Sequence, residues 1–467
     1  MLKIASTDCL FVYTIYIYIY IYIYVYILHF LFFFFSLILP LLLSLFLSFL
    51  SPFFLLPSSF SSSFFFLPNR FSLDCKQKAK ISLRNTPDWG VSSVCISPSD
   101  TLAFTMNIDG YAPLFYIRDI CSVDHSQPVF IHSVPETSTK ICSSLTFHAF
   151  RPALLGCTVH SPVSPADVYT VNLLSTVEKE YSQTSVDDGE AKGKVLGTGS
   201  VFVRWTESEV AGLNRTQFVA PTLHRYASFD GRQIPFFLYS PSSSSSSSSA
   251  PLSPPFPCVI HIHGGPESQS RPTYSSLYQY LVSQGISVAV PNVRGSTGYG
   301  KVYQKLDNGP RRIDSTKDIG SLLEWMEQQP ERFGKKIVYG GSYGGYMVLS
   351  SMIHYGDRLV AGCESVGISN FVTFLESTQE YRRNLRRQIY GDERDPEMRK
   401  ILMDVSPLTH AHKINKPMLI CQGARDPRVP QTESMQIVSA IREKGVYCGY
   451  VVAEDEGMLK RRRGDWY

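Results

Sequence analysis

The chain has 467 residues, enough for two or three domains, and its formal net charge of +4 is small for that length. Apolar residues make up 44% of the sequence and charged residues 18%, which indicates a globular protein with an additional hydrophobic segment. The small charge excludes a strongly basic nucleic-acid-binding surface. The ten cysteines occur singly, without a C-x-x-C pair, so neither a disulfide framework nor a zinc site is expected.

An almost wholly apolar stretch covers residues 10–57, within a low-complexity segment that we place at residues 1–75. Since about 20 apolar residues suffice to cross a bilayer, the stretch can be a membrane anchor or an over-long signal segment. Its Ile-Tyr alternation and Phe/Leu/Ser run are also what an ATATAT repeat and a pyrimidine-rich tract encode, so translated non-coding sequence is the alternative. For an anchor, the positive-inside rule predicts a cytoplasmic globular part, because the flanking basic residues lie mainly after the stretch: Arg70, Lys76, Lys78 and Lys80, against Lys3 before it.

Residues 76–221 are expected to form a β-rich region. The stretches 91–119 and 143–173 share a plan of short β-rich runs broken by Ser-Pro, Asn and Asp-Gly turns. Short strands at such spacing predict propeller blades or a sandwich. The region has room for about three blades, whereas closed propellers have about four to eight. We therefore expect a partial propeller.

Residues 222–467 predict an α/β domain. A β-hairpin is expected over 224–241, followed by an unbroken serine run, 242–249, which we interpret as a flexible surface loop. Beyond it, buried-strand patterns such as "PCVIHIHGG" and "KKIVYGGS" alternate with helical patterns such as "DSTKDIGSLLEWMEQQ". Strands that alternate with helices favour a mostly parallel sheet with helices on both faces.

The strongest chemical signal is a G-x-S-x-G motif centred on Ser342, between a predicted strand and a predicted helix. In that setting the serine occupies a very tight turn that exposes its Oγ at the carboxyl end of the strand. The flanking Gly340 and Gly344 let the backbone pass close by, and the next helix directs its positive N-terminus at the turn. Ser342 is therefore the candidate nucleophile.

A glycine turn in "HIHGGP", residues 261–266, follows an earlier strand. A loop of this kind donates one oxyanion-hole N–H in α/β-hydrolases, and the residue after the nucleophile donates the other, which makes Gly265 and Tyr343 the candidates. His261 and His263 lack a third metal ligand, so no metal is expected.

The third motif, "CQGARDPRVP", ends a predicted strand and places Asp426 in the following loop. The triad order in α/β-hydrolases is Ser, then Asp or Glu, then His, and Asp426 fits the middle position.

Taken together, these motifs resemble the prolyl oligopeptidase family of serine peptidases, in the acylaminoacyl peptidase and dipeptidyl-peptidase-like branch. The resemblance covers about 222–457 and rests on "SFDGRQIPFFLY", "HIHGGPESQSRP", "VPNVRGSTGYGKVY", "YGGSYGGYM", "YGDERDP", "SPLTHAHKINKPMLICQGARDPRVP" and "DEG". It implies an α/β-hydrolase fold, a peptide substrate, no cofactor, and a propeller that limits access to short peptides. It also implies that Ser342 is the nucleophile, Asp426 the triad acid, and Gly265 and Tyr343 the oxyanion donors.

One departure concerns the triad histidine. The family pattern is D-E-G-H-G, whereas this chain reads Asp455-Glu456-Gly457-Met458. The last histidine, His412, precedes Asp426, so no histidine can follow the acid in the expected order. A thioether has no titratable proton, so Met458 cannot serve as the base. Three hypotheses follow: a serine peptidase impaired and C-terminally incomplete as written, a catalytically dead binding protein, and an esterase on the same fold.

Overall fold

The computed structural model describes residues 90–120, 131–173, 202–210, 212–241 and 253–457. Two units divide the chain, residues 1–71 and 72–467, and every described residue belongs to the second. The apolar stretch 10–57, the serine run 242–249 and Met458 lie outside the described residues. Of the helices that are described, none combines the length and the apolarity needed to cross a bilayer.

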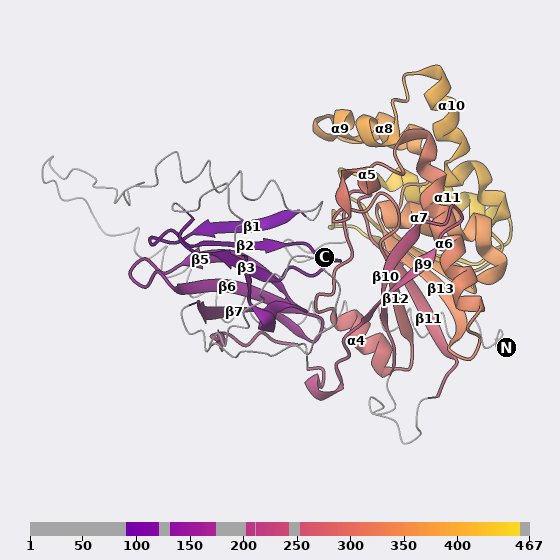
Figure 1. Cartoon of the computed structure of the whole chain (residues 1–467). Coiled ribbons are helices and arrows are strands. Elements are labelled where there is room, and N and C mark those ends of the chain that lie inside the picture. Colours follow the sequence, from indigo (N-terminus) through magenta and orange to yellow (C-terminus); the bar gives the residue numbers. More distant parts are fainter. Residues whose placement is uncertain (1–89, 121–130, 174–201, 211, 242–252, 458–467) are drawn as a thin grey trace, which may run out of the picture. The chain divides into compact units, whose positions relative to one another are not determined.

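Strands dominate the described residues up to Arg204. They form two four-stranded antiparallel sheets, with the strand orders β1-β2-β3-β4 and β5-β6-β7-β8 (Figure 1). The strand bounds are β1 Val91–Ile96, β2 Leu102–Met106, β3 Leu114–Ile117, β4 His132–Ser133, β5 Ile141–Phe147, β6 Leu154–Ser161, β7 Ser164–Asn172 and β8 Phe202–Arg204.

Alternating burial gives strand β6 one packed face. In β6, Leu155, Cys157 and Val159 are buried while the residues between them are half-buried, which is the period of two expected of a strand. The three side chains belong to one hydrophobic cluster with Leu114 and Tyr116 of β3. Four antiparallel strands per sheet is the strand count of a propeller blade. The sequence allows about three blades, and the described residues contain two four-stranded sheets. A partial propeller stays a prediction.

The second part of the described chain is built on one eight-stranded sheet, with the order β16-β15-β14-β13-β11-β12-β10-β9. Strands β11 to β16 run parallel, whereas β9 and β10 form the predicted antiparallel hairpin at one edge. The bounds are β9 Thr222–Ala227, β10 Gln233–Tyr239, β11 Phe256–Ile262, β12 Ser287–Pro291, β13 Phe333–Gly341, β14 Ala361–Ser365, β15 Met418–Gly423 and β16 Cys448–Ala453.

Helices alternate with the parallel strands, and a helical insertion separates β14 from β15. The helices between successive strands are α4 Ser276–Ser283, α5 Gly300–Gln304, α6 Arg312–Glu327, α7 Tyr343–Tyr355 and α11 Gln431–Glu443. The insertion consists of α8 Phe371–Ser377, α9 Glu380–Tyr390, α10 Pro396–Asp404 and the 3-10 helix η7 Pro407–Lys413.

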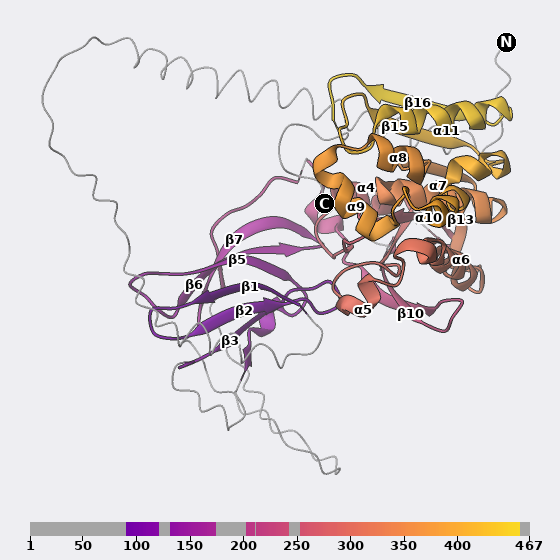
Figure 2. The same cartoon turned by 90° about the horizontal axis from the view of Figure 1, so that it is seen from above.

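The sheet buries both of its faces, as the sequence predicts. On one side, Ile260, Val338 and Ile420 join a hydrophobic cluster with side chains of α6, α7 and α11. On the other side, His261 and Tyr239 contact Tyr278 of α4 through their rings. Helices flank the sheet in both views (Figures 1 and 2). The α/β-hydrolase architecture with a preceding β-rich region is thereby confirmed.

Parallel strands place their carboxyl ends at one edge of the sheet. Four chain segments meet at that edge, after β11, β13, β15 and β16. They carry the Gly264-Gly265 turn, Ser342, Asp426 and the 454–457 loop, respectively. The topology therefore gathers the predicted catalytic segments from positions far apart in the sequence.

Candidate active site

Ser342 occupies a strained turn between β13 and α7. Its φ of +58° and ψ of −118° lie in a region that residues with a side chain rarely adopt, at a cost of about 1–3 kcal/mol. Its backbone N–H donates a 2.8 Å hydrogen bond to the Ser365 carbonyl of the neighbouring strand β14. This is the geometry of a nucleophile elbow, in which the tight turn presents the serine Oγ.

Close backbone packing explains the glycines of the motif. A Cβ at Gly344 would lie 2.1 Å from the carbonyl oxygen of Ile262 on β11. A Cβ at Gly340 would lie 2.6 Å from the carbonyl oxygen of Gly344. Gly341, in contrast, has only ordinary contacts, the nearest at 3.5 Å. The turn can therefore close only with glycine on each side of the Gly341–Tyr343 step.

The predicted oxyanion donors lie on two segments that flank Ser342. Tyr343 is the first residue of α7, so its N–H has no acceptor within the helix. A Cβ at Gly264 would lie 3.5 Å from the Ser342 Cβ, which places the Gly264-Gly265 turn beside the nucleophile. Gly265 has a φ of +138°, where a side chain would be strained. The donor roles of Gly265 and Tyr343 stay predictions.

Beneath the elbow lies a buried polar cluster that sequence reasoning missed. The Tyr343 hydroxyl donates to Asp307 at 2.9 Å and contacts Ser315 at 2.8 Å. Arg312, 1% exposed as a side chain, forms an ion pair with Asp307 and lies over the rings of Tyr343 and Tyr390. No motif in "LDNGPRRIDS" marks these residues as a unit, because the cluster is assembled by tertiary packing.

A second buried acid lies on β14. Glu364 is 0% exposed, and its Oε2 accepts a 2.7 Å hydrogen bond from the Gly367 N–H. Its Oε1 has no partner among the described residues. Burial raises the pKa of Glu364 to about 8, so the side chain is protonated near neutral pH. A Cβ at Gly345 would meet Oε2 at 3.0 Å, which places this acid directly against α7.

Asp426 keeps one carboxylate oxygen free. Its Oδ1 accepts hydrogen bonds from the N–H groups of Arg428 at 2.7 Å and Val429 at 3.1 Å. Its Oδ2 is buried and has no partner within the described part of the chain. Burial raises the pKa of this carboxyl, and the two N–H donors act in the opposite direction. The backbone thus orients the carboxylate and leaves one acceptor available.

The loop after β16 packs against the start of the Asp426 loop. Arg425 donates its N–H to the Glu456 carbonyl at 2.9 Å, and its side chain pairs with Asp455 at 2.9 Å. A Cβ at Gly423 would lie 1.5 Å from the Gly457 carbonyl oxygen, so only glycine fits there. The chain therefore reaches Gly457 beside the acid loop, and the next residue, Met458, lies outside the described residues.

Histidines near the catalytic edge have other partners. His263 contacts Ser296 at 2.8 Å through Nε2 and the Gly264 carbonyl at 2.7 Å through Nδ1. His261 contacts Tyr278, and burial lowers its pKa to about 4. His410 lies in η7, before the amino end of β15 and therefore away from that edge, and contacts the Asp404 carbonyl. Within the described ranges, no three His, Cys, Asp or Glu side chains gather as metal ligands.

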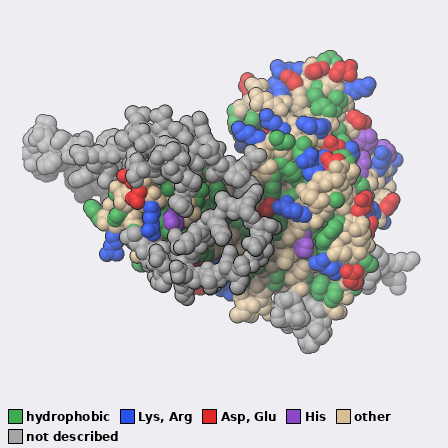
Figure 3. Space-filling view, viewed as in Figure 1, with side chains coloured by type: hydrophobic (Ala, Val, Ile, Leu, Met, Phe, Trp, Pro, Cys, Tyr) green, Lys and Arg blue, Asp and Glu red, His purple; other side chains and the backbone are tan. Residues whose placement is uncertain are grey.

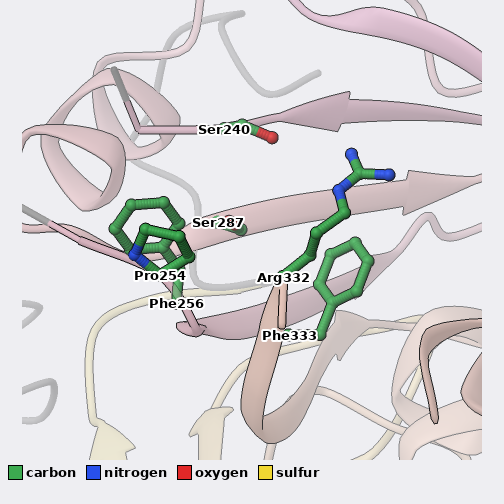
Figure 4. A pocket seen from close by; sticks show the side chains of 6 residues that line it. All are labelled: Ser240, Pro254, Phe256, Ser287, Arg332 and Phe333. Carbon is green, nitrogen blue, oxygen red and sulfur yellow. The ribbon is translucent and has the colours of Figure 1, made fainter. Parts of the chain in front are cut away.

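A pocket of about 220 Å³ lies at the opposite edge of the sheet. Figure 4 shows its lining side chains near the amino ends of β11, β12 and β13. It combines two serines, apolar rings and one guanidinium, but no acid or histidine that could activate a serine: Ser240, Pro254, Phe256, Ser287, Arg332 and Phe333. The pocket therefore lies apart from Ser342 and Asp426, and the catalytic edge remains the candidate site.

Comparison with known proteins identifies similar sequences for the part of the chain that carries this edge. Residues 272–462 match the prolyl oligopeptidase family. Dipeptidyl aminopeptidase BIII of Pseudoxanthomonas mexicana is 36% identical over 235 residues, which are 50% of this chain and 34% of that protein. The acylamino-acid-releasing enzyme of Arabidopsis thaliana is 27% identical over 312 residues, 63% of this chain and 39% of that enzyme. The chain thus spans well under half the length of these relatives.

A crystal structure of puromycin hydrolase shares the fold. The superposition has a TM-score of 0.64 and covers 80% of this chain and 51% of that one. The sequence identity is 21%, so the likeness concerns the fold.

Proposed function

We propose, since residues 272–462 match the prolyl oligopeptidase family, that this chain is a serine peptidase of short or N-acylated peptides. Ser342 attacks the scissile carbonyl, Asp426 orients the base, and the N–H groups of Gly265 and Tyr343 stabilise the oxyanion. The relatives named as a dipeptidyl aminopeptidase and an acylamino-acid-releasing enzyme support this class of substrate.

One observation carries the proposal: the free Oδ2 of Asp426. A buried carboxylate oxygen without a hydrogen bond is costly, and such atoms are rare in folded proteins. Here it lies in the loop against which Glu456 and Gly457 pack. An imidazole N–H at position 458 would follow directly on that contact, and Asp426 would hold the ring in the tautomer that accepts a proton from serine.

The chemistry needs that imidazole. In the acylation step, the Ser342 Oγ bonds to the carbonyl carbon while its proton moves to the base. The proton then passes to the leaving amine as the C–N bond breaks, and water hydrolyses the ester by the same route in reverse. Removal of the base alone costs on the order of 10⁶ in kcat in a serine protease triad. With Met458 in that place, we propose that the peptidase is strongly impaired.

A second candidate function, a binding protein with an inactive site, is favoured by the same residue. Because Met458 cannot take a proton, a chain that still binds peptides at the catalytic edge would act without turnover. The strained turn at Ser342 persists in either case. Fold alone does not fix the scissile bond either, so the test includes an ester beside an amide.

Reaction with a fluorophosphonate probe separates these functions. The full-length chain, Met458→His and Met458→His/Ser342→Ala are incubated with the probe, and the labelled residue is located by mass spectrometry. We expect fast labelling of Met458→His at Ser342, slow labelling of the unaltered chain and none in the double variant. A folded Met458→His chain that stays unlabelled would refute the peptidase. Parallel assays with N-acetyl-alanine p-nitroanilide and a p-nitrophenyl ester distinguish peptidase from esterase.

A further inference from the structure

Several arginines near the catalytic edge lack the acidic partners that their neighbours have. Arg387, Arg394 and Arg399 each contact a carboxylate, those of Glu393, Asp392 and Glu376, respectively. Among the described residues, four guanidinium groups of α9 and the acid loop form no ion pair within 4.0 Å. One of them, Arg383, turns back to the Thr378 carbonyl at 2.9 Å. The other three are Arg382 and Arg386 of α9, and Arg428 of the acid loop.

Helix α9 and the two residues before it contact the two loops that flank the nucleophile. Thr378 donates its hydroxyl to the Arg428 carbonyl at 2.9 Å, and the Gln379 N–H donates to the Pro427 carbonyl at 3.4 Å. At the other end of the helix, Arg386 donates to the Gly265 carbonyl at 3.0 Å. The helix therefore contacts both the Asp426 loop and the predicted oxyanion turn.

The positive charges lie close enough to affect one another. Burial lowers the pKa of Arg428, and the charges of Arg382 and Arg386 lower it further, while Asp426 opposes them. Asp426 supplies one negative charge, and its Oδ1 is already occupied by two backbone N–H groups. Three further acids lie around α9. Asp307 and Glu267 act on Tyr390 through their charges, and Glu380 opens the helix. Asp307 is paired with Arg312, whereas Glu267 and Glu380 form no ion pair among the described residues.

A solvated basic helix face is the ordinary alternative, but burial argues against it. Tyr381 and Leu385 are 73% and 54% exposed and form the outer side of α9. The three arginines are less exposed than these two residues, since each of them is half-buried. Figure 3 shows Lys and Arg side chains gathered over the α9 part of the surface. Half-buried guanidinium groups of like charge are costly unless an anion joins them, and the planar guanidinium matches a carboxylate in a bidentate manner.

From this arrangement we infer that Arg382 and Arg386, together with Arg428, form a subsite for a carboxylate of the peptide substrate. The inference rests on the proposed function of the same edge. The carboxylate can come from a free C-terminus close to the scissile bond or from an acidic side chain. In either case the subsite would select anionic peptides over neutral ones.

Peptide binding tests the subsite without any need for turnover. The full-length chain with Ser342→Ala is titrated with three peptides of equal length, and the dissociation constants are measured by calorimetry. The peptides are Ac-Ala-Ala-Ala with a free carboxylate, its C-terminal amide, and Ac-Ala-Glu-Ala amide. We expect at least one anionic peptide to bind about tenfold more tightly than the neutral amide, because charge-assisted hydrogen bonds are the strong ones. The peptide that gains affinity identifies the source of the carboxylate: the free C-terminus in the first peptide, or the Glu side chain in the third.

Arginine variants assign that preference to the subsite. Arg386→Gln and, separately, Arg382→Gln should reduce the ratio of anionic to neutral affinity to about one. Arg399→Gln is the matched control, since Arg399 pairs with Glu376 on the neighbouring helix and should keep the ratio. The Arg382 side chain donates no hydrogen bond to the described residues, so Arg382→Gln serves as the test if Arg386→Gln unfolds. Equal binding of all three peptides, or a ratio unchanged in both variants, would overturn the inference. The two proposals can fail separately. If Met458→His is not labelled by the fluorophosphonate but the preference for anionic peptides persists, the peptidase function is refuted and the carboxylate subsite stands.

Discussion

The hydroxyl of Tyr343 donates a 2.9 Å hydrogen bond to the carboxylate of Asp307, which lies 36 residues earlier in the chain. Tyr343 directly follows Ser342, so this bond ties the strained turn to the loop before α6. Arg312 completes the cluster through its ion pair with Asp307 and a 2.9 Å hydrogen bond to the Ile389 carbonyl of α9. The nucleophile elbow therefore rests on a buried ion pair that also holds α9.

Arg312→Met should destabilise the fold strongly. The change leaves Asp307, a 0% exposed residue, as an uncompensated buried charge, at a cost of about 3–5 kcal/mol. Asp307→Leu/Arg312→Met removes both charges and should recover much of that loss. Urea unfolding followed by tryptophan fluorescence measures the three stabilities. If Arg312→Met were as stable as the parent protein, the ion pair would contribute little to the free energy of unfolding.

Gly344→Ala should prevent the turn at Ser342 from closing. The new Cβ would lie 2.1 Å from the Ile262 carbonyl, so β11 and α7 must separate. We expect a loss of more than about 3 kcal/mol or failure to fold. Gly341→Ala is the matched control, because its Cβ meets nothing nearer than 3.5 Å and should cost about 1 kcal/mol or less. Equal effects of the two variants would contradict the steric account; thermal melts of both proteins decide between the outcomes.

Local patterns allowed the prediction of the strand–turn–helix around Ser342, the hairpin within residues 224–241 and the alternation of strands and helices. Each follows from residues adjacent in sequence, which is why the sequence alone indicates them. The Asp307–Arg312–Tyr343 cluster and buried Glu364 were missed, because their partners come together only in the tertiary fold. Nothing in a single sequence marks an Asp or an Arg as buried, since such residues are mostly exposed.

Glu364 should make the stability of the protein depend on pH. Its pKa of about 8 in the fold exceeds the value of about 4.3 expected when unfolded. The unfolded state therefore releases a proton that the folded state keeps, and stability falls as pH rises from about 4.3 to about 8. The slope is at most about 1.4 kcal/mol per pH unit.

Glu364→Gln should remove this decline, because the amide oxygen can still accept from Gly367 and the side chain cannot ionise. Urea unfolding at pH 5.5 and pH 7.5 should show the unaltered chain losing up to about 3 kcal/mol more than Glu364→Gln between the two. Glu376→Gln, at a half-exposed ion pair with Arg399, is the control and should keep the decline. Parallel pH profiles for the parent and Glu364→Gln would contradict the assignment.

The catalytic edge illustrates a different limit of sequence reasoning. The motifs placed Ser342 and Asp426 at strand ends, and topology brings these ends to one edge of the sheet. The contact of Gly423 with Gly457 could not be foreseen, because it depends on the pairing of β15 with β16. That contact is what places position 458 directly after a residue that packs on the acid loop.

The most direct test of the account is the kinetic coupling between position 458 and Asp426. The kcat/KM for N-acetyl-alanine p-nitroanilide is measured for the full chain, Met458→His, Asp426→Asn and the double variant. Met458→His should raise kcat/KM by at least about 10³-fold, and Asp426→Asn should remove most of that gain while it changes the parent little. No gain in a folded Met458→His protein, or a gain that Asp426→Asn leaves intact, would contradict a triad built from Ser342, Asp426 and position 458.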